Sequence, residues 1–309
     1  MTPLRKLQPF SGFQRLYVKD ESVQPNGTFK DRLSVCAKDV VPRHATIAAI
    51  SYGNTAISLC RVLAGDAREL VIFIPSDLPS WHLGPSSTGR TLDGATLRRE
   101  IERFAIVIEL DLAAGVYDDD ALATIAHRHG ACGSPFVNAT EGLSVPAYVP
   151  IIEEIHRQLG RLPDVCLVPF GAGILCNEIR DYVDRLESQC EVIALAVASP
   201  SSIARMLYGP IWVDVDELRL RGVAMSRHRS PDRTGALRRS YPVYAVTDDE
   251  IRVGLKRAGE AKVSCEPSGA VGLGVLDRLP VLVPSIDSEH SVVVAINTGN
   301  GIDGFFCGS

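Results

Sequence analysis

The chain has 309 residues, of which 46% are hydrophobic and 22% are charged, and its formal net charge at pH 7 is −5. This is the composition of an ordinary globular protein with a sizeable core, built as one large domain or two modest ones. The acidic balance, without interleaved basic and aromatic residues, argues against nucleic-acid binding. The apolar runs are strand-length, and the N-terminus lacks the apolar core of a signal peptide.

The eight cysteines occur at irregular positions without any C-x-x-C pair, and several stand inside apolar runs such as VCLVPF. This pattern is typical of buried thiols in a reducing compartment, not of a disulfide framework or a zinc site. We therefore expect a soluble, cytoplasmic protein that binds neither a membrane nor a metal.

The first motif along the chain is NGTFKDRLS, at residues 26–34. The Asn26-Gly27 pair favours a tight turn, and the residues from Lys30 onwards predict a helix with an acid in its first turn. Lys30 is therefore expected where a loop meets the positive end of a helix dipole. Most lysines are solvated at the surface, so a chemical role for Lys30 depends on the motifs that follow it.

Beyond this motif, short apolar runs rich in β-branched residues alternate with longer helical patterns. Strands that are apolar throughout and separated by helices predict parallel sheets covered on both faces. The motif TDDE predicts a capping box that opens a helix at residue 247. The expected strands are residues 45–50, 70–75, 164–170, 191–198 and 291–299.

Two segments interrupt this alternation. Residues 76–95 are rich in Pro, Gly and Ser, and they predict a long loop with about one helical turn. Residues 222–242 contain a cluster of arginines. That cluster indicates either a solvated loop or a flap that closes on an anionic group of a substrate.

Ligands of parallel α/β sheets collect beyond the carboxyl ends of the strands, so the turns after the strands are the places to expect a site. The turn SYGNT (51–55) suits a carboxylate, or it simply caps the next helix. The turn GAGIL (171–175) suits a phosphate, or it is a plain tight turn. The turn NTGNG (297–301) puts Thr298 at a strand end, or it binds nothing.

Together these motifs supply an amine, an amide-hydroxyl turn, a phosphate-sized nest and a hydroxyl at a strand end. A phosphorylated aldehyde cofactor needs such partners, because a lysine attacks its carbonyl to form a Schiff base while backbone amides hold its phosphate. A nicotinamide cofactor is disfavoured, since Cys176 stands where the dinucleotide fingerprint has its third glycine.

The motifs, taken in order, resemble those of the fold type II pyridoxal-phosphate enzymes, the tryptophan-synthase-β type, and among them the threonine synthase branch. The resemblance extends over nearly the whole chain. The matching pieces are TPL (2–4), LYVKDESVQPNGTFKDR (16–32), SYGNTA (51–56), VNATEG (137–142), LPDVCLVPFGAG (162–173), VTDDEI (246–251), EPSGAV (266–271) and NTGNGID (297–303).

The resemblance implies an α/β fold of two domains, each an open, mostly parallel sheet covered by helices. The smaller domain would comprise residues 36–142, and the larger, cofactor-binding domain residues 1–35 and 143–309. Pyridoxal 5'-phosphate would be the cofactor and a small amino acid the substrate. The family also implies a homodimer.

Residue by residue, the resemblance makes Lys30 the Schiff-base lysine and the later proton carrier. Asn54 would hydrogen-bond the ring hydroxyl oxygen of the cofactor, and Thr298 would meet the pyridine nitrogen. The residues implied to hold the substrate carboxylate are Ser51, Tyr52, Gly53 and Thr55. The residues implied to cradle the phosphate are Gly171, Ala172, Gly173, Ile174 and Leu175. Two further candidates near the site are Glu266 and Asn300.

The sequence departs from the family pattern at several of these positions. Ile174 and Leu175 are bulky for a phosphate loop, Asn300 stands where the threonine synthase branch commonly has His, and Tyr52 replaces a more usual Ser. The chain also begins at TPL and is shorter than most threonine synthases. These differences leave cofactor binding intact as an expectation and open the choice of substrate.

Three functions follow from this resemblance and its departures. The first is a synthase or lyase like threonine synthase, which converts O-phosphohomoserine to threonine or runs a related reaction. The second is β-replacement or β-elimination on serine, O-activated serine or threonine, as in cysteine synthase-like enzymes and dehydratases, within specialised biosynthesis. The third is a non-catalytic binding protein, which the presence of Lys30, Asn54 and Thr298 argues against. A neutral hydroxyl at the pyridine nitrogen favours elimination or replacement at the side chain.

Overall fold

The computed structural model describes residues 1–51, 53–76, 82–83, 92–111, 117–198, 201–204, 211–228 and 240–301. The chain folds into two compact units. The large unit comprises residues 1–23 and 148–300, and the small unit comprises residues 24–147 together with residue 301. This division differs from the predicted domains in residues 24–35 and 143–147, and the predicted domain boundaries stay a prediction.

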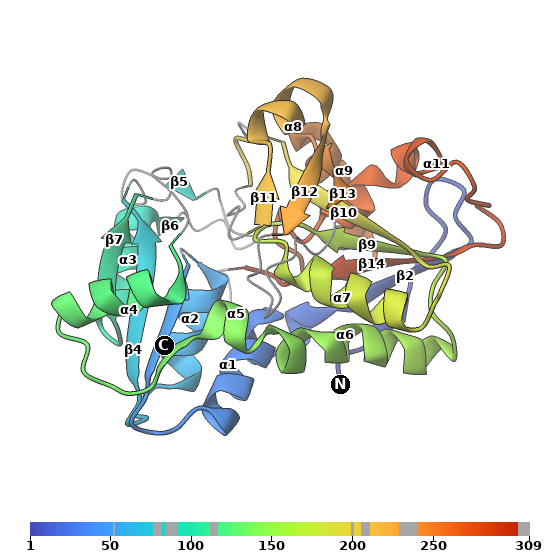
Figure 1. Ribbon diagram of the computed structural model, residues 1–309. Helices are drawn as coiled ribbons and strands as arrows, with labels where there is room; N and C mark the ends of the chain where they lie inside the picture. The colour runs from blue at the N-terminus through green and yellow to red at the C-terminus, as the bar shows by residue number, and fades with distance from the viewer. Residues whose placement is uncertain are drawn as a thin grey trace. The chain divides into compact units, whose positions relative to one another are not determined.

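The large unit is built on an eight-stranded sheet with the order β1-β2-β14-β9-β10-β13-β12-β11 (Figure 1). Its five inner strands are parallel, and antiparallel strands close both edges. Every residue of β9 and β14 is buried, as expected for strands covered on both faces. The strands are β1 (Leu4–Lys6), β2 (Arg15–Asp20), β9 (Val165–Pro169), β10 (Glu191–Val197), β11 (Ile211–Val213), β12 (Val223–His228), β13 (Ser240–Val246) and β14 (Val292–Asn297).

Helices cover both faces of this sheet, with α6 and α7 on one face and α9 and α11 on the other (Figure 1). The predicted capping box is confirmed, because Thr247 and Glu250 cap each other's backbone N–H groups at the start of α9. The helices are η1 (Glu21–Val23), α6 (Ser144–Leu159), α7 (Ile174–Arg185), α8 (Val215–Arg221), α9 (Asp248–Glu260), α10 (Val271–Gly274), η3 (Val275–Arg278) and α11 (Leu279–Leu282).

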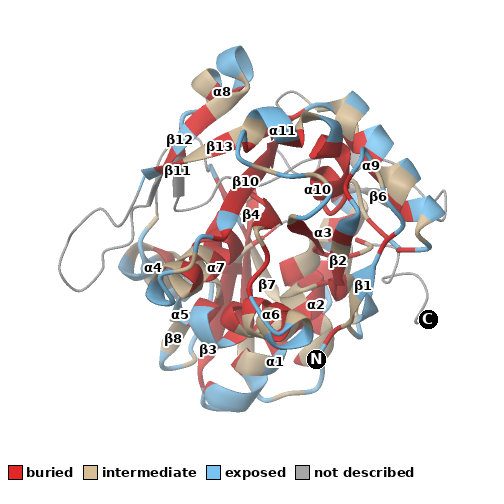
Figure 2. Ribbon diagram, turned by 90° about the vertical axis from the view of Figure 1, so that its right-hand side faces the viewer, coloured by how far each residue is buried: buried red, intermediate tan, exposed pale blue. Residues whose placement is uncertain are grey.

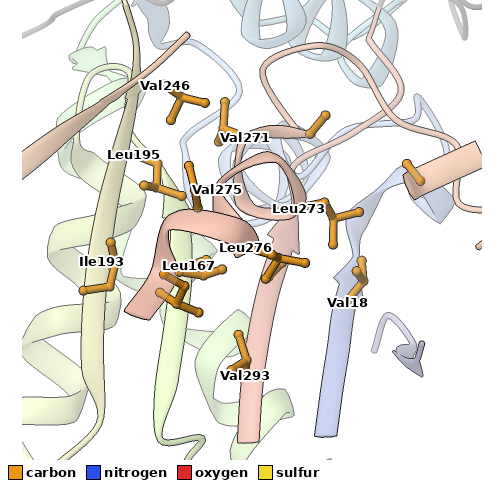
Figure 3. Packing of buried hydrophobic residues seen from close by; sticks show 14 of the residues in the cluster. Val18, Leu167, Ile193, Leu195, Val246, Val271, Leu273, Val275, Leu276 and Val293 are labelled. Atoms are coloured by element: carbon orange, nitrogen blue, oxygen red, sulfur yellow. The ribbon is translucent and has the colours of Figure 1, made fainter. Parts of the chain in front are cut away.

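The core of the large unit lies where α10 and η3 cross the strands (Figure 3). Leu167, Ile193 and Val293 of the sheet face Val271 and Leu276 of these short helices (Figure 3). Burying each such side chain contributes about 1.5–3 kcal/mol. The glycines of EPSGAVGLGVL serve this packing, since a Cβ on the glycine at position 272 would lie 3.0 Å from the Cβ of residue 295 in β14. The loop of residues 264–270 directly precedes α10, and it is hydrogen-bonded to the residues that follow β14.

The small unit is built on a four-stranded, fully parallel sheet with the order β7-β4-β3-β8. A separate two-stranded ribbon pairs β5 with β6. Its strands are β3 (Thr46–Ile50), β4 (Glu69–Pro75), β5 (His82–Leu83), β6 (Leu92–Asp93), β7 (Ile106–Leu110) and β8 (Phe136–Asn138). Its helices are α1 (Lys30–Val40), α2 (Asn54–Val62), α3 (Gly94–Glu102), α4 (Asp119–Arg128) and α5 (Ala139–Gly142).

The predicted fold class is confirmed, since parallel sheets covered by helices form both units. Figure 2 shows that burial concentrates in the strands while the outer helices α8 and α11 expose one side. Within the ranges that the structure describes, no helix has the length and apolar character needed to span a membrane.

Two segments differ from the sequence prediction of loops. Residues 76–95 contain the strands β5 and β6 and the first residues of α3, in addition to positions outside the described ranges. Residues 222–242 contain β12 and the start of β13, which pair with each other. Residues 229–239, with most of the arginine cluster, lie outside the described ranges.

Candidate active site

Lys30 opens α1, directly after the turn at Asn26-Gly27. Gly27 has φ +74°, in the left-handed region that glycine adopts without strain. The Lys30 N–H donates to Thr28 Oγ1 at 3.3 Å, and Lys30 Nζ lies 4.5 Å from the centre of the Phe29 ring. The predicted loop-to-helix junction is therefore confirmed.

The burial of the six lysines distinguishes Lys30 from the others. Lys19 is fully buried, and its Nζ donates to Glu154 Oε2 at 2.6 Å and to Thr2 O at 2.7 Å. Lys30 is half-buried. Partial burial at the start of a helix suits an amine that must reach a ligand. The remaining four lysines are exposed: Lys6, Lys38, Lys256 and Lys262.

The turn SYGNT connects β3 to α2 in the small unit. Ser51 is buried, and its Oγ accepts hydrogen bonds from the N–H groups of Gly53 (3.3 Å) and Ala56 (3.2 Å). The capping role that the sequence left open is therefore present, and the hydroxyl hydrogen of Ser51 can still be donated to a carboxylate. No described atom lies within 4 Å of where a Cβ on Gly53 would stand, so there is room beside this turn. Asn54 and Thr55 are the first residues of α2.

Tyr52, the remaining residue predicted to bind the substrate carboxylate, lies outside the described ranges. The implied roles of the other residues in this turn stay predictions.

The turn GAGIL connects β9 to α7 in the large unit. Gly173 has φ +78° and precedes the first residue of α7. Ile174 and Leu175 are only 8% and 5% exposed, so their side chains belong to the interior. The bulky side chains of these two residues, which depart from the family pattern, therefore pack in the core and do not cover the backbone of the turn. The predicted Gly171 and Ala172 are half-buried in the same turn.

The start of α7 offers backbone donors for an anion. The N–H of Asn177 donates to the carbonyl of Gly173 at 3.0 Å, which makes it the first intrahelical bond of the helix. The N–H groups of residues 174–176 precede this bond and have no acceptor within the helix. Such a helix start fits a phosphate through backbone groups alone.

Thr298 follows β14 in the large unit and is 5% exposed. Its hydroxyl forms no hydrogen bond with any part of the chain that the structure describes. The hydroxyl hydrogen can therefore be donated to an acceptor on a ligand. The ring nitrogen of a pyridine is an acceptor of this kind, and the residue therefore fits the predicted cofactor.

Asn297, which the sequence did not single out, fixes the position of Thr298. Its Nδ2 donates to Asp20 Oδ1 at 3.1 Å and to Ser264 O at 2.8 Å. Its Oδ1 accepts from the Gly299 N–H and from the Cys265 thiol, both at 3.2 Å. Burial raises the pKa of the Cys265 thiol well above its ordinary value, so the thiol stays protonated and can donate.

The same network places the two remaining candidates. The N–H of Glu266 donates to Gly299 O at 2.9 Å, which ties the EPSGAV loop to the residue after Thr298. A Cβ on Gly269 would lie 2.7 Å from Asn297 Oδ1, so only glycine allows this approach. Glu266 and Asn300 are both half-buried, and their roles stay predictions.

The chain is similar to known proteins both in sequence and in fold. A family model described as pyridoxal-phosphate dependent enzyme matches residues 1–299. Among solved structures, the chain is similar to a threonine deaminase from T.th., with TM-score 0.59, 16% identity and coverage of 97% of this chain and 92% of that chain. It is also similar to a fungal L-serine ammonia-lyase from Rhizomucor miehei, with TM-score 0.62, 18% identity and coverage of 96% and 93%.

A third similar structure is the holo diaminopropionate ammonia lyase from Escherichia coli, with TM-score 0.60, 17% identity and coverage of 96% of this chain and 84% of that chain. At these identities the similarity establishes a shared fold, and it does not assign the substrates of these enzymes to this chain.

Proposed function

The chain belongs to the family of pyridoxal-phosphate dependent enzymes, and from this we propose that it eliminates or replaces a group on the side chain of a small amino acid. The reaction we favour resembles that of threonine synthase, O-phosphohomoserine to threonine or a related conversion. Pyridoxal phosphate supplies an aldehyde that bonds to amines and a ring that withdraws electrons. The chain's own residues then decide which bond reacts.

The observation that carries the proposal is Thr298, a residue only 5% exposed whose hydroxyl has no partner among the described residues. Facing a pyridine nitrogen, a neutral hydroxyl does not hold a proton on the ring as a carboxylate would. Loss or exchange of a side-chain group is then favoured over prolonged build-up of negative charge at the α-carbon. Lys30 takes up and returns the proton at the α-carbon in this proposal.

The remaining roles follow from the resemblance and are supported by the local geometry. Asn54 hydrogen-bonds the ring oxygen, and the N–H groups at the start of α7 bind the phosphate. Ser51 donates its hydroxyl hydrogen to the substrate carboxylate. We further propose a cytoplasmic homodimer, which rests on the resemblance and on the many buried thiols.

A second candidate is β-replacement or β-elimination on serine, an O-activated serine or threonine. The structural similarity to the threonine deaminase and the L-serine ammonia-lyase is the observation that favours it. The two candidates differ in the position of the leaving group, which is on the γ-carbon in the first and on the β-carbon in the second.

The test is a visible absorption titration of the purified protein with pyridoxal phosphate. We expect an absorption band from lysine-bound cofactor in the wild type and in Lys38→Ala, which removes an exposed lysine of the same helix. Lys30→Ala should lose that band. If Lys30→Ala keeps the band, or the wild type never forms it, the assignment of Lys30 is wrong.

The substrate is tested by product analysis with single amino acids. Threonine formed from O-phosphohomoserine supports the first candidate. A 2-oxo acid formed from serine, threonine or O-phosphoserine supports the second, as does cysteine formed from O-acetylserine and sulfide with release of acetate.

A further inference from the structure

We propose that Asp31 and Ser58 form a positioning pair that holds Lys30 in register with the SYGNT turn. The pair links the start of α1 to the first turns of α2, so the reactive amine and Asn54 keep a fixed spacing. This inference rests on the proposed function, because it assigns the pair a role in binding pyridoxal phosphate. Neither residue of the pair touches the cofactor itself.

Asp31 is a buried carboxylate immediately after Lys30, with only 1% of its surface exposed. It accepts the backbone N–H of Asn26 at 2.6 Å and the Asn26 side-chain Nδ2 at 2.9 Å. Both bonds close the Asn-Gly turn back onto the helix. The conformation of the five residues that precede Asp31, Lys30 included, therefore depends on this one side chain.

Ser58 connects the same carboxylate to the neighbouring helix α2 through a hydrogen bond. Its Oγ donates to Asp31 Oδ1 at 2.5 Å, across 27 positions of sequence. Because its single hydroxyl hydrogen is committed there, the Ser34 hydroxyl, 2.7 Å away, donates to Ser58 in turn. Both serines are 0% exposed, so water does not compete for these bonds.

The place of Ser58 in α2 gives the link its functional meaning. Asn54 is the first residue of α2, and Ser58 lies four residues later, on the same face of the helix. The helices α1 and α2 also pack against each other. Lys30 and Asn54 follow separate turns, and the Asp31–Ser58 bond is a buried polar connection between their helices. Reacting and binding groups need a spacing held to a fraction of an ångström, which flexible turns do not provide by themselves.

A carboxylate is required at position 31 because the Asn26 and Ser58 groups that face it are donors. An amide of the same shape has one oxygen and one NH2, so in Asp31→Asn either orientation points an NH2 at a donor of Asn26 or Ser58. Asp31→Asn should therefore weaken the turn in either orientation and the link in one of them, whereas Ser58→Ala breaks only the link. Ser58→Thr keeps the hydroxyl.

The matched control is Thr46→Val in the same unit. Thr46 is 1% exposed, and its Oγ1 donates to Glu69 Oε2 at 2.7 Å, another buried hydroxyl on a carboxylate. This bond fastens the start of β3 and lies at the opposite end of that strand from Ser51. A purely structural contribution of Ser58 would resemble that of Thr46.

The experiment measures the dissociation constant of pyridoxal phosphate by absorption titration, together with the melting temperature of each cofactor-free variant. We expect Ser58→Ala to bind about tenfold more weakly and Asp31→Asn more weakly still, given what loss of a hydrogen bond to a charged group costs. Thr46→Val and Ser58→Thr should bind within about twofold of the wild type, as an intact link requires. Hydrogen exchange at the Asn26 amide of the cofactor-free protein should quicken in Asp31→Asn and stay at the wild-type rate in Ser58→Ala.

Wild-type affinity in Ser58→Ala would overturn the inference, and so would an equal loss in Thr46→Val. If Ser58→Ala does not fold, Asp31→Asn and Ser58→Thr decide in the same way. A wild type that does not bind pyridoxal phosphate would refute the proposed function and this inference with it. Normal binding by the wild type with normal binding by both link variants would refute the inference alone.

Discussion

Asn297 is a residue whose replacement should cost the large unit considerable stability. It makes four hydrogen bonds, two through Nδ2 and two through Oδ1, and is 3% exposed. Each bond contributes about 0.5–1.5 kcal/mol net, and a buried donor left without a partner costs about 1–3 kcal/mol. Asn297→Ala leaves the Gly299 N–H in that state, whereas the Cys265 thiol still has Glu266 O as an acceptor at 3.3 Å. We expect a loss of about 3–5 kcal/mol, or roughly 10 °C in melting temperature.

Asn297→Asp separates the hydrogen bonds from the shape of the side chain. It keeps an acceptor for Gly299 but places a carboxylate oxygen where Nδ2 now lies, 3.1 Å from Asp20 Oδ1. Two buried carboxylates at that distance raise the pKa of the pair in the folded state. The folded variant then binds more protons at this pair than the unfolded chain does, so the contribution of the pair to stability is greatest below about pH 4 and falls as pH rises through the raised pKa.

Urea unfolding followed by circular dichroism at pH 5 and pH 8 measures both variants. Gln14→Ala, at an exposed side chain, is the control and should change stability by less than about 0.5 kcal/mol. A loss under about 1 kcal/mol in Asn297→Ala would refute the role of the four bonds. Greater stability of Asn297→Asp than of Asn297→Ala at pH 8 would refute the repulsion between the carboxylates.

Two further predictions concern the start of α7 and the acid limb of stability. Gly173→Ala places a side chain on a backbone with φ +78° and should lower the free energy of unfolding in urea by about 1–2 kcal/mol. Gly259→Ala, in α9 with open space around its Cβ, should be neutral or stabilising. Equal effects of the two variants would contradict backbone strain at position 173. The Ser11 hydroxyl, against the opposing effect of burial and with help from Arg257, holds the pKa of Asp277 below its ordinary value. The contribution of Asp277 to stability is therefore present above about pH 4 and is lost as pH falls through the lowered pKa. The urea midpoint of Asp277→Asn should then drop less between pH 5 and pH 3 than that of the wild type. An unchanged drop would exclude Asp277 as a source of this loss.

The parallel core was predictable because its strands carry their signal locally. The runs at 164–170 and 291–299 are apolar throughout, and they correspond to β9 and β14, whose residues are all buried. The capping box at Thr247 is equally local, since its two partners belong to one four-residue motif. The prediction of a loop was wrong for β12. Residues 224–226 of this strand alternate between buried and exposed positions, but the arginines that follow favoured a loop.

The supporting contacts of the candidate site were not predictable, because their partners are distant in sequence. Asn297 and Asp20 are 277 residues apart, and Ser58 and Asp31 are 27 apart. The sequence showed Asp31 only as an acid in a first helical turn. In the structure, Asp31 accepts hydrogen bonds both from the Asn26 turn and from Ser58 of α2, and the sequence spacing does not predict that these groups lie close together.

The contrast between Lys19 and Lys30 shows that a sequence motif can identify the family without identifying the role of each residue in it. Both lysines belong to the stretch LYVKDESVQPNGTFKDR, and the residues around them single out Lys30 only by its place at a predicted helix start. Lys19 Nζ has three acceptors, among them the Glu154 carboxylate, so its amine is held as a buried cation. That ion pair ties β2 and the residues of TPL to α6. A nucleophile must reach its ligand, and the half-buried Lys30 at a helix start suits that predicted role better than the fully buried Lys19.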